Sequence, residues 1–141
     1  LALFVDYGVT RAGYYAPDRD GGTLAGHYRH RRVDDPYERV GVQDLTAWVD
    51  FTRVAEAGLA AGLEVAGYTT QAHFLLGTGF ARHVGALAEA AGAGEGALLA
   101  HAAARLVLPG EMGERFKCLA LARGDLPELC GFALRDFTAA L

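Results

Sequence analysis

The sequence contains no serine and only two cysteines, and both scarcities exclude classes of functional site. A chain without serine cannot carry a Ser-His-Asp nucleophile. Cys118 lies in an apolar run and Cys130 beside a glycine, so neither has the spacing of a metal or redox site. The histidines outside one basic cluster also lack partners at ligand spacing. We therefore expect reduced, structural cysteines and histidines that serve packing or lie at the surface.

Long hydrophobic runs and phosphate-binding motifs are absent as well. No apolar stretch reaches the roughly 20 residues that cross a bilayer, no signal peptide is recognisable, and no Gly-x-Gly-x-x-Gly or phosphate loop follows a strand. The 141 residues, 52% hydrophobic and 21% charged, are typical of one globular domain. We expect a soluble intracellular protein without a membrane span.

The chain also lacks a strong charge of either sign. A formal charge of −4 gives no global attraction to nucleic acid. His27-Tyr28-Arg29-His30-Arg31-Arg32 is a local exception, although Asp34, Asp35 and Glu38 follow it closely. The cluster fits a solvated, salt-bridged segment, a site for an anion or an acidic partner, or, through its two histidines, a metal site.

The most informative stretch is the first one, Leu1-Ala2-Leu3-Phe4-Val5-Asp6-Tyr7-Gly8. Consecutive apolar residues without alternation are typical of a strand buried on both faces of a parallel sheet, although a short buried helix has the same pattern. Because ligands bind outside the carboxyl ends of such strands, Asp6 to Gly8 is the first candidate site. Since no initiator methionine precedes it, we expect the chain to begin inside a longer protein.

A strand–helix–strand unit is predicted from the next ordered segments. Asp50 is a good N-cap for a helix over 51–61, because its carboxylate can accept backbone N–H groups, and Val49 and Val54 have hydrophobic-staple spacing. After Gly62, alternation of apolar and polar residues predicts a second strand over 63–69.

The remaining segments are predicted from the positions of glycine and proline and from the spacing of apolar residues. Residues 9–22 read as a loop, 23–33 as loosely extended and 36–43 as turn-like. Apolar positions at helical spacing then predict two amphipathic helices over about 80–91 and 98–106, separated by a glycine-rich break at 92–96. A last apolar run predicts a strand over 116–122, and the form of the closing segment is left open.

Polar residues in apolar or turn surroundings are the candidate site residues: Asp6, Tyr7, Asp44, Thr46, Asp50, Thr69, Thr70 and Gln71. Asp44 and Asp50 flank a loop-to-helix junction, where they either converge on a cationic substrate or serve as a helix cap and a solvated side chain. Thr69 to Gln71 enters a helix, where side chains can satisfy backbone N–H groups. Spacing alone favours the capping interpretations.

Several motifs together resemble one family more specifically than any motif alone. These are Leu3-Phe4-Val5-Asp6-Tyr7-Gly8, Gly22-Thr23-Leu24, Asp44-Leu45-Thr46-x-x-Val49-Asp50-Phe51, Gly67-Tyr68-Thr69-Thr70-Gln71-x-x-Phe74-Leu75 and Met112-Gly113-Glu114-x-Phe116-Lys117. In this order they resemble the C-terminal half of the MidA-like S-adenosylmethionine-dependent methyltransferases, which include the mitochondrial complex I assembly factor that methylates a protein arginine. The match extends over nearly the whole chain.

The resemblance implies an α/β fold, the C-terminal part of a Rossmann-like class I methyltransferase sheet. Residues 1–7 would be its fifth strand, 63–69 the sixth and 116–122 the antiparallel seventh. All of 1–141 would belong to one methyltransferase domain, with 71–108 as a helical insertion between the last two strands. The cofactor, S-adenosylmethionine, would be held mainly by an N-terminal half that is absent here.

The implied function is methylation of a protein arginine, with this chain forming the substrate side and being inactive alone. Asp6 and Asp44 are the implied catalytic residues, because carboxylates pair with a guanidinium. Tyr7, Thr46, Asp50 and Gln71 are the implied substrate-binding residues, and no metal is expected.

The alternative is a non-catalytic assembly or interaction module on the same fold. The expected partner is a protein substrate rather than nucleic acid, with a homo-oligomer as a further possibility. The expected location is the bacterial cytoplasm or, second to that, the mitochondrion.

Overall fold

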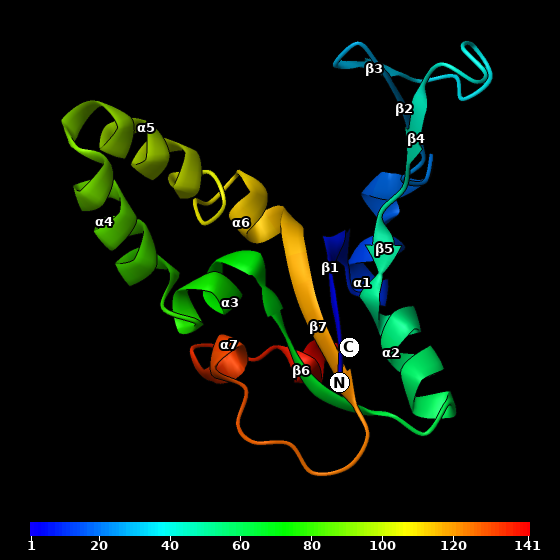
Figure 1. Cartoon of the computed structure of the whole chain (residues 1–141). Coiled ribbons are helices and arrows are strands. Elements are labelled where there is room, and N and C mark those ends of the chain that lie inside the picture. The colour runs from blue at the N-terminus through cyan, green and yellow to red at the C-terminus, as the bar shows by residue number, and fades with distance from the viewer.

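The computed structural model describes residues 1–141, and its main sheet has β7 at the centre. The first strand, β1 (Ala2–Val9), pairs antiparallel with β7 (Phe116–Ala122), and β7 pairs antiparallel with β6 (Glu64–Thr70). The short β5 (Val49–Asp50) runs parallel to the end of β1, which gives the order β5-β1-β7-β6. All three strands predicted from the sequence are confirmed to within about two residues at their ends (Figure 1).

One face of this sheet is covered by α2 (Phe51–Ala60), the predicted helix. Its start is fixed as expected, because the Asp50 carboxylate accepts the backbone N–H of Arg53 at 3.1 Å. The apolar side of α2 lies on the sheet, where buried side chains from both elements form one core cluster: Phe51, Ala55, Tyr68, Leu119 and Leu121. Val49 and Val54, at staple spacing, pack against the same cluster.

The opposite face holds a second, smaller core. Here α3 (Gln71–Gly77) and α7 (Cys130–Ala133) contact each other, and Phe132 packs on Cys118 and Ala120. Gly67 allows this approach, because a Cβ at that position would lie 2.4 Å from the Phe132 ring. The chain closes with a 3-10 turn, η2 (Thr138–Ala140), against β6.

Between β6 and β7 the chain forms α4 (Phe80–Ala91), α5 (Ala93–Ala104) and α6 (Met112–Arg115). Helices α4 and α5 pack on each other as a hairpin that stands away from the sheet (Figure 1). The two predicted helices are therefore present, but the predicted glycine break at 92–96 is wrong in extent. Only Gly92, at φ +81°, interrupts the helices, and Gly96 lies inside α5, where it touches the backbone of Ala88.

A second, three-stranded antiparallel sheet extends from the other side of the molecule, and we call residues 25–46 the arm (Figure 1). Its strands β2 (Ala25–Tyr28), β3 (Arg31–Val33) and β4 (Asp44–Thr46) are arranged in the order β3-β2-β4. The predicted loop before it contains two single turns of helix, α1 (Arg11–Tyr14) and η1 (Pro17–Arg19).

The expectation that the first strand is buried on both faces is wrong for this chain. Leu3, Phe4 and Val5 are 46%, 42% and 48% exposed. The reason is the pairing: β5 reaches only Gly8 and Val9, so the rest of that edge of β1 has no neighbouring strand. None of the helices has the length and apolar character needed to span a membrane.

Candidate functional site

Polar side chains gather at the end of the main sheet where β1 and β6 finish. Asp6 of β1, Lys117 of β7 and Thr70 of β6 lie directly opposite one another across the three strands. Directly paired residues project on the same face of a sheet, so these three form one row. In α/β folds this is the edge of the sheet at which ligands bind.

Lys117, at the centre of this row, was not singled out by sequence reasoning. Its side chain is half-buried, and its ammonium donates to the main-chain carbonyl of Glu114. Burial lowers the pKa of Lys117, while the nearby Glu114 acts in the opposite direction. The available signal was composition, since Lys117 is the sole lysine in the sequence and follows directly on an apolar strand start.

Asp6 and Tyr7, both predicted from the sequence, lie at this edge. Asp6 is exposed, and its Oδ1 accepts the backbone N–H of Tyr7 at 2.7 Å, which leaves its other oxygen free for a ligand. The Tyr7 ring meets Phe116 edge-on with ring centres 5.7 Å apart. Because successive residues of a strand project from opposite faces of the sheet, the Tyr7 and Phe116 rings lie on the face opposite to Asp6 and Lys117.

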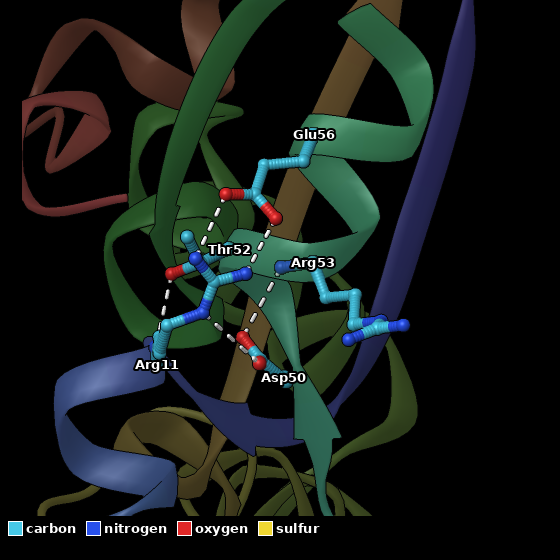
Figure 2. A network of polar contacts seen from close by, with 5 residues as sticks. All are labelled: Arg11, Asp50, Thr52, Arg53 and Glu56. Carbon is cyan, nitrogen blue, oxygen red and sulfur yellow. Dashed lines mark hydrogen bonds and ion pairs between the residues drawn. The ribbon is translucent and has the colours of Figure 1, made fainter. Parts of the chain in front are cut away.

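Asp50 is held in a network that joins the exit of β1 to α2 (Figure 2). The Arg11 guanidinium donates to both carboxylate oxygens of Glu56 and lies 3.9 Å from Asp50 Oδ2, while the Arg11 backbone N–H donates to Thr52 Oγ1 at 2.9 Å. The hydrogen bond from Arg11 lowers the pKa of Glu56. With one oxygen on the Arg53 N–H and the other facing Arg11, Asp50 is occupied within the fold.

Asp44 and Thr46 lie in the arm, in a different sheet from Asp6 and Asp50. Asp44 is exposed on β4, opposite His27 of β2. Thr46 Oγ1 is 3.4 Å from both the Ala25 carbonyl and His27 Nδ1. The structure therefore brings Asp44 and Thr46 together around His27 and separates them from the carboxylates at the main-sheet edge.

The Thr69–Gln71 segment is buried where β6 meets α3. Thr70 caps α3, as the sequence suggested, by accepting the His73 N–H at 3.3 Å. The Gln71 amide donates to the Leu106 carbonyl at 2.9 Å and thereby ties α3 to the segment after α5. Thr69 is fully buried and its hydroxyl has no partner, a feature shared with the neighbouring Tyr68.

The site suits a cationic ligand better than it suits a nucleotide-like cofactor. Carboxylates at the sheet edge and on β4 are the groups that pair with a guanidinium or ammonium. The turn after β1 is not glycine-rich, and α1 that follows it has four residues, so it forms no cradle of backbone N–H groups. The residues of this chain thus do not fit a main cofactor-binding site by themselves.

Known proteins with similar sequence and structure are methyltransferase relatives. Residues 1–69 match a family model described as "Putative S-adenosyl-L-methionine-dependent methyltransferase". A "likely methyl transferase" from Burkholderia thailandensis, solved with S-adenosyl-homocysteine bound, is 40% identical, with a TM-score of 0.88 over 99% of this chain and 36% of that one. A native structure of an uncharacterized protein from the same organism gives the same identity and TM-score, over 99% of this chain and 37% of that one.

A search of curated proteins finds no match. The chain spans little more than a third of the length of its structural relatives. The structural similarity to a relative that holds S-adenosyl-homocysteine, at a TM-score of 0.88, confirms the predicted methyltransferase-type α/β fold.

Proposed function

We propose that this chain is the substrate-side portion of an S-adenosylmethionine-dependent methyltransferase of the MidA-like type, acting on an arginine of a protein in the bacterial cytoplasm. The observation that carries the proposal is the similarity over 99% of the chain, at 40% identity, to a structure that holds S-adenosyl-homocysteine. The free oxygen of Asp6 at the ligand-binding edge supports a guanidinium as the group that receives the methyl, since the neighbouring Lys117 is engaged by the Glu114 carbonyl.

In this proposal the chain contributes mainly by orienting the substrate. S-adenosylmethionine supplies a methyl group on a sulfonium, and residues outside these 141 hold it. Asp6 pairs with the guanidinium, keeps one of its nitrogens directed at the methyl group and offsets the positive charge of the site, while Asp44, on the arm, pairs with another cationic group of the substrate. Asp6 Oδ2 also accepts the proton that the nitrogen loses.

The other site residues have supporting roles under the same proposal. Tyr7, held by Phe116, covers the opposite face of the same sheet edge, and Thr46 fixes the strand that carries Asp44. Gln71, buried and donating to the Leu106 carbonyl, supports the end of β6 from inside the fold. Asp50, because both its oxygens are occupied, positions α2 more than it binds substrate.

The test is methyl transfer by the longer protein that contains this chain. It is incubated with methyl-labelled S-adenosylmethionine and a lysate from its own organism, and labelled proteins are digested and sequenced by mass spectrometry. We expect label on an arginine nitrogen of a protein. Label confined to lysine, small molecules or nucleic acid would refute the proposed substrate, and no label with bound cofactor would refute the activity.

One observation favours a second function, a non-catalytic interaction module. The α4–α5 hairpin contacts the rest of the chain mainly through α3, and it leaves Leu87 59% and Leu98 73% exposed. Exposed leucines on a projecting hairpin are typical of a protein contact. An inactive protein that forms a stable complex through this hairpin would support the alternative.

A further inference from the structure

The arm carries a group of arginines that the proposed catalytic roles do not use. Arg29, Arg31, Arg32 and Arg39 line a hollow of about 870 Å³ together with Tyr28. All four arginines are exposed. This part of the surface is therefore rich in positive charge, although the whole chain carries a net charge of −4.

Two of these arginines are available to a ligand. Arg32 pairs with Asp34 at 3.0 Å and Arg39 with Glu38 at 3.1 Å, but Arg29 and Arg31 form no ion pair. The existing pairs are solvent-exposed and so contribute little, which makes them easy to exchange for a ligand carboxylate. The arm thus has both unpaired and exchangeable guanidinium groups.

Tyr28 holds two guanidinium groups on its ring. The Arg39 guanidinium lies 4.6 Å and the Arg29 guanidinium 5.3 Å from the ring centre. Stacking on an aromatic ring reduces the freedom of a long side chain before any ligand arrives. Less conformational entropy is then lost on binding.

In the turn that joins β2 to β3, two residues other than glycine adopt positive φ angles, which costs backbone energy. Arg29 and His30 have φ values of +50° and +62°, in the left-handed region that glycine adopts without steric cost. Two successive positive φ values in a two-residue hairpin loop form a type I′ turn, in which asparagine or glycine is usual, so the two larger side chains are held there at some cost to stability. A glycine pair would form the same turn more easily but would present no cation.

The arm is joined to the ligand-binding edge of the main sheet. β4 continues after two residues into β5, whose Val49 lies opposite Gly8 of β1. Figure 1 shows the arm continuing through β5 to β1, the strand that carries Asp6, so a polypeptide held on the arm can extend toward that strand.

We propose that the arm binds an acidic segment of a protein partner through Arg29 and Arg31. The inference rests on the proposed function only in making that partner the methylated protein. Arginine forks pair with carboxylates through bidentate hydrogen bonds. A protein segment is favoured over nucleic acid because the chain as a whole has a net charge of −4, which gives no attraction to a long phosphate backbone, whereas a short acidic segment needs only the local arginines.

The test measures binding rather than catalysis. The longer protein that contains this chain is titrated into a fluorescent peptide of alternating glutamate and serine, and anisotropy is recorded at low and at physiological salt. Arg29→Glu/Arg31→Glu should weaken binding about tenfold. Arg82→Glu/Arg135→Glu makes the same charge change at exposed positions outside the arm and should alter binding less than about twofold.

Three results would overturn the proposal: equal losses in the two double variants, equal binding of a glutamine–serine peptide, or tighter binding of a single-stranded oligonucleotide of the same charge. Arg29→Gln/Arg31→Gln, which removes charge without reversing it, guards against a folding defect and should show a smaller loss in the same direction. If the peptide binds through the arm but no methyl transfer is found, this inference stands and the proposed function is refuted. If methyl transfer is found but peptide binding does not depend on the arm, the proposed function stands and this inference is refuted.

Discussion

Tyr68 illustrates what a single residue contributes at the core of this fold. Its ring is 2% exposed and packs on Phe51, yet its hydroxyl has no hydrogen-bond partner. Burial, with a smaller effect of the negative Asp50, raises the pKa of Tyr68 from 10.0 to about 12. The hydroxyl is therefore a cost to stability that becomes larger at alkaline pH.

We expect Tyr68→Phe to stabilise the chain by about 1 kcal/mol at neutral pH, because it removes an unsatisfied buried donor while keeping the ring. The raised pKa means that the folded state holds its proton more tightly than the unfolded state, so this group's contribution to stability is lost between about pH 10 and 12. In Tyr68→Phe, the free energy of unfolding should therefore fall less between about pH 10 and 12 than it does in the parent protein. Urea unfolding across this range measures both effects, and a variant less stable than the parent at neutral pH would show that the hydroxyl has a partner.

Substitutions of Asp44 and Asp50 are predicted to affect different properties of the longer protein, activity for Asp44 and stability for Asp50. Under the proposed function, Asp44→Asn should weaken substrate binding by on the order of 2–4 kcal/mol where its pair with the substrate is desolvated, and it should leave the melting temperature nearly unchanged, because the side chain is exposed in the free protein. Asp50→Ala should destabilise by roughly 0.5–2 kcal/mol through loss of the α2 cap, with activity falling mainly through stability. Methylation rate and thermal midpoint separate the two cases. Wild-type turnover and substrate affinity in Asp44→Asn would remove Asp44 from the site.

At the scale of elements, the α4–α5 hairpin provides a matched pair of glycines. A Cβ on Gly96 would lie 2.2 Å from the Ala88 carbonyl oxygen, whereas Gly94 in the same helix has open space around it. Gly96→Ala should destabilise the hairpin by about 1–3 kcal/mol, because backbone must move. Gly94→Ala should stabilise it by about 0.5–1 kcal/mol through helix propensity. Hydrogen exchange of α4 and α5 amides reports both, and equal effects would mean that the helices do not pack at Gly96.

The elements that sequence reasoning placed well are those with a local physical signal. The helix after Asp50 has a cap and an apolar stripe, and the strand over 116–122 is an unbroken apolar run. The extent of the break at 92–96 was wrong because Gly94 and Gly96 are tolerated inside a helix whose close packing requires one of them. That contact lies between two helices and leaves no local pattern.

The site was less predictable because it depends on long-range pairing. Asp6 was identified from its place at a strand end, but Lys117 joins it only because β7 inserts between β1 and β6. Spacing left open whether Asp44 and Asp50 converge and favoured a helix cap and a solvated side chain; the structure agrees, because Asp50 caps α2 and Asp44 is exposed in a different sheet. A separation of six residues does not reveal that the two aspartates lie on strands of different sheets, β4 and β5.

For the whole molecule, the exposed first strand predicts self-association of the 141-residue chain. Leu3, Phe4 and Val5 lie on a strand whose edge opposite β7 is mostly unpaired. An exposed apolar strand edge is a template for pairing with another chain. Sedimentation velocity should show mass increasing with concentration, and Phe4→Lys should reduce it. Val40→Lys, at an exposed apolar residue in the arm, is the control and should leave it unchanged. A monomer at all concentrations would contradict the prediction.

The central position of β7 also affects the order of events during synthesis. β1 pairs along its length with a strand that begins 114 residues after it, Ala2 against Leu121 at the extremes, so the contact order of the sheet is high. At roughly 5–20 residues per second, a ribosome needs on the order of 10 s to reach β7 after β1 has been made. β1 therefore remains without its β7 partner for that time, and we expect chaperones that recognise apolar strand edges to raise the yield of this protein.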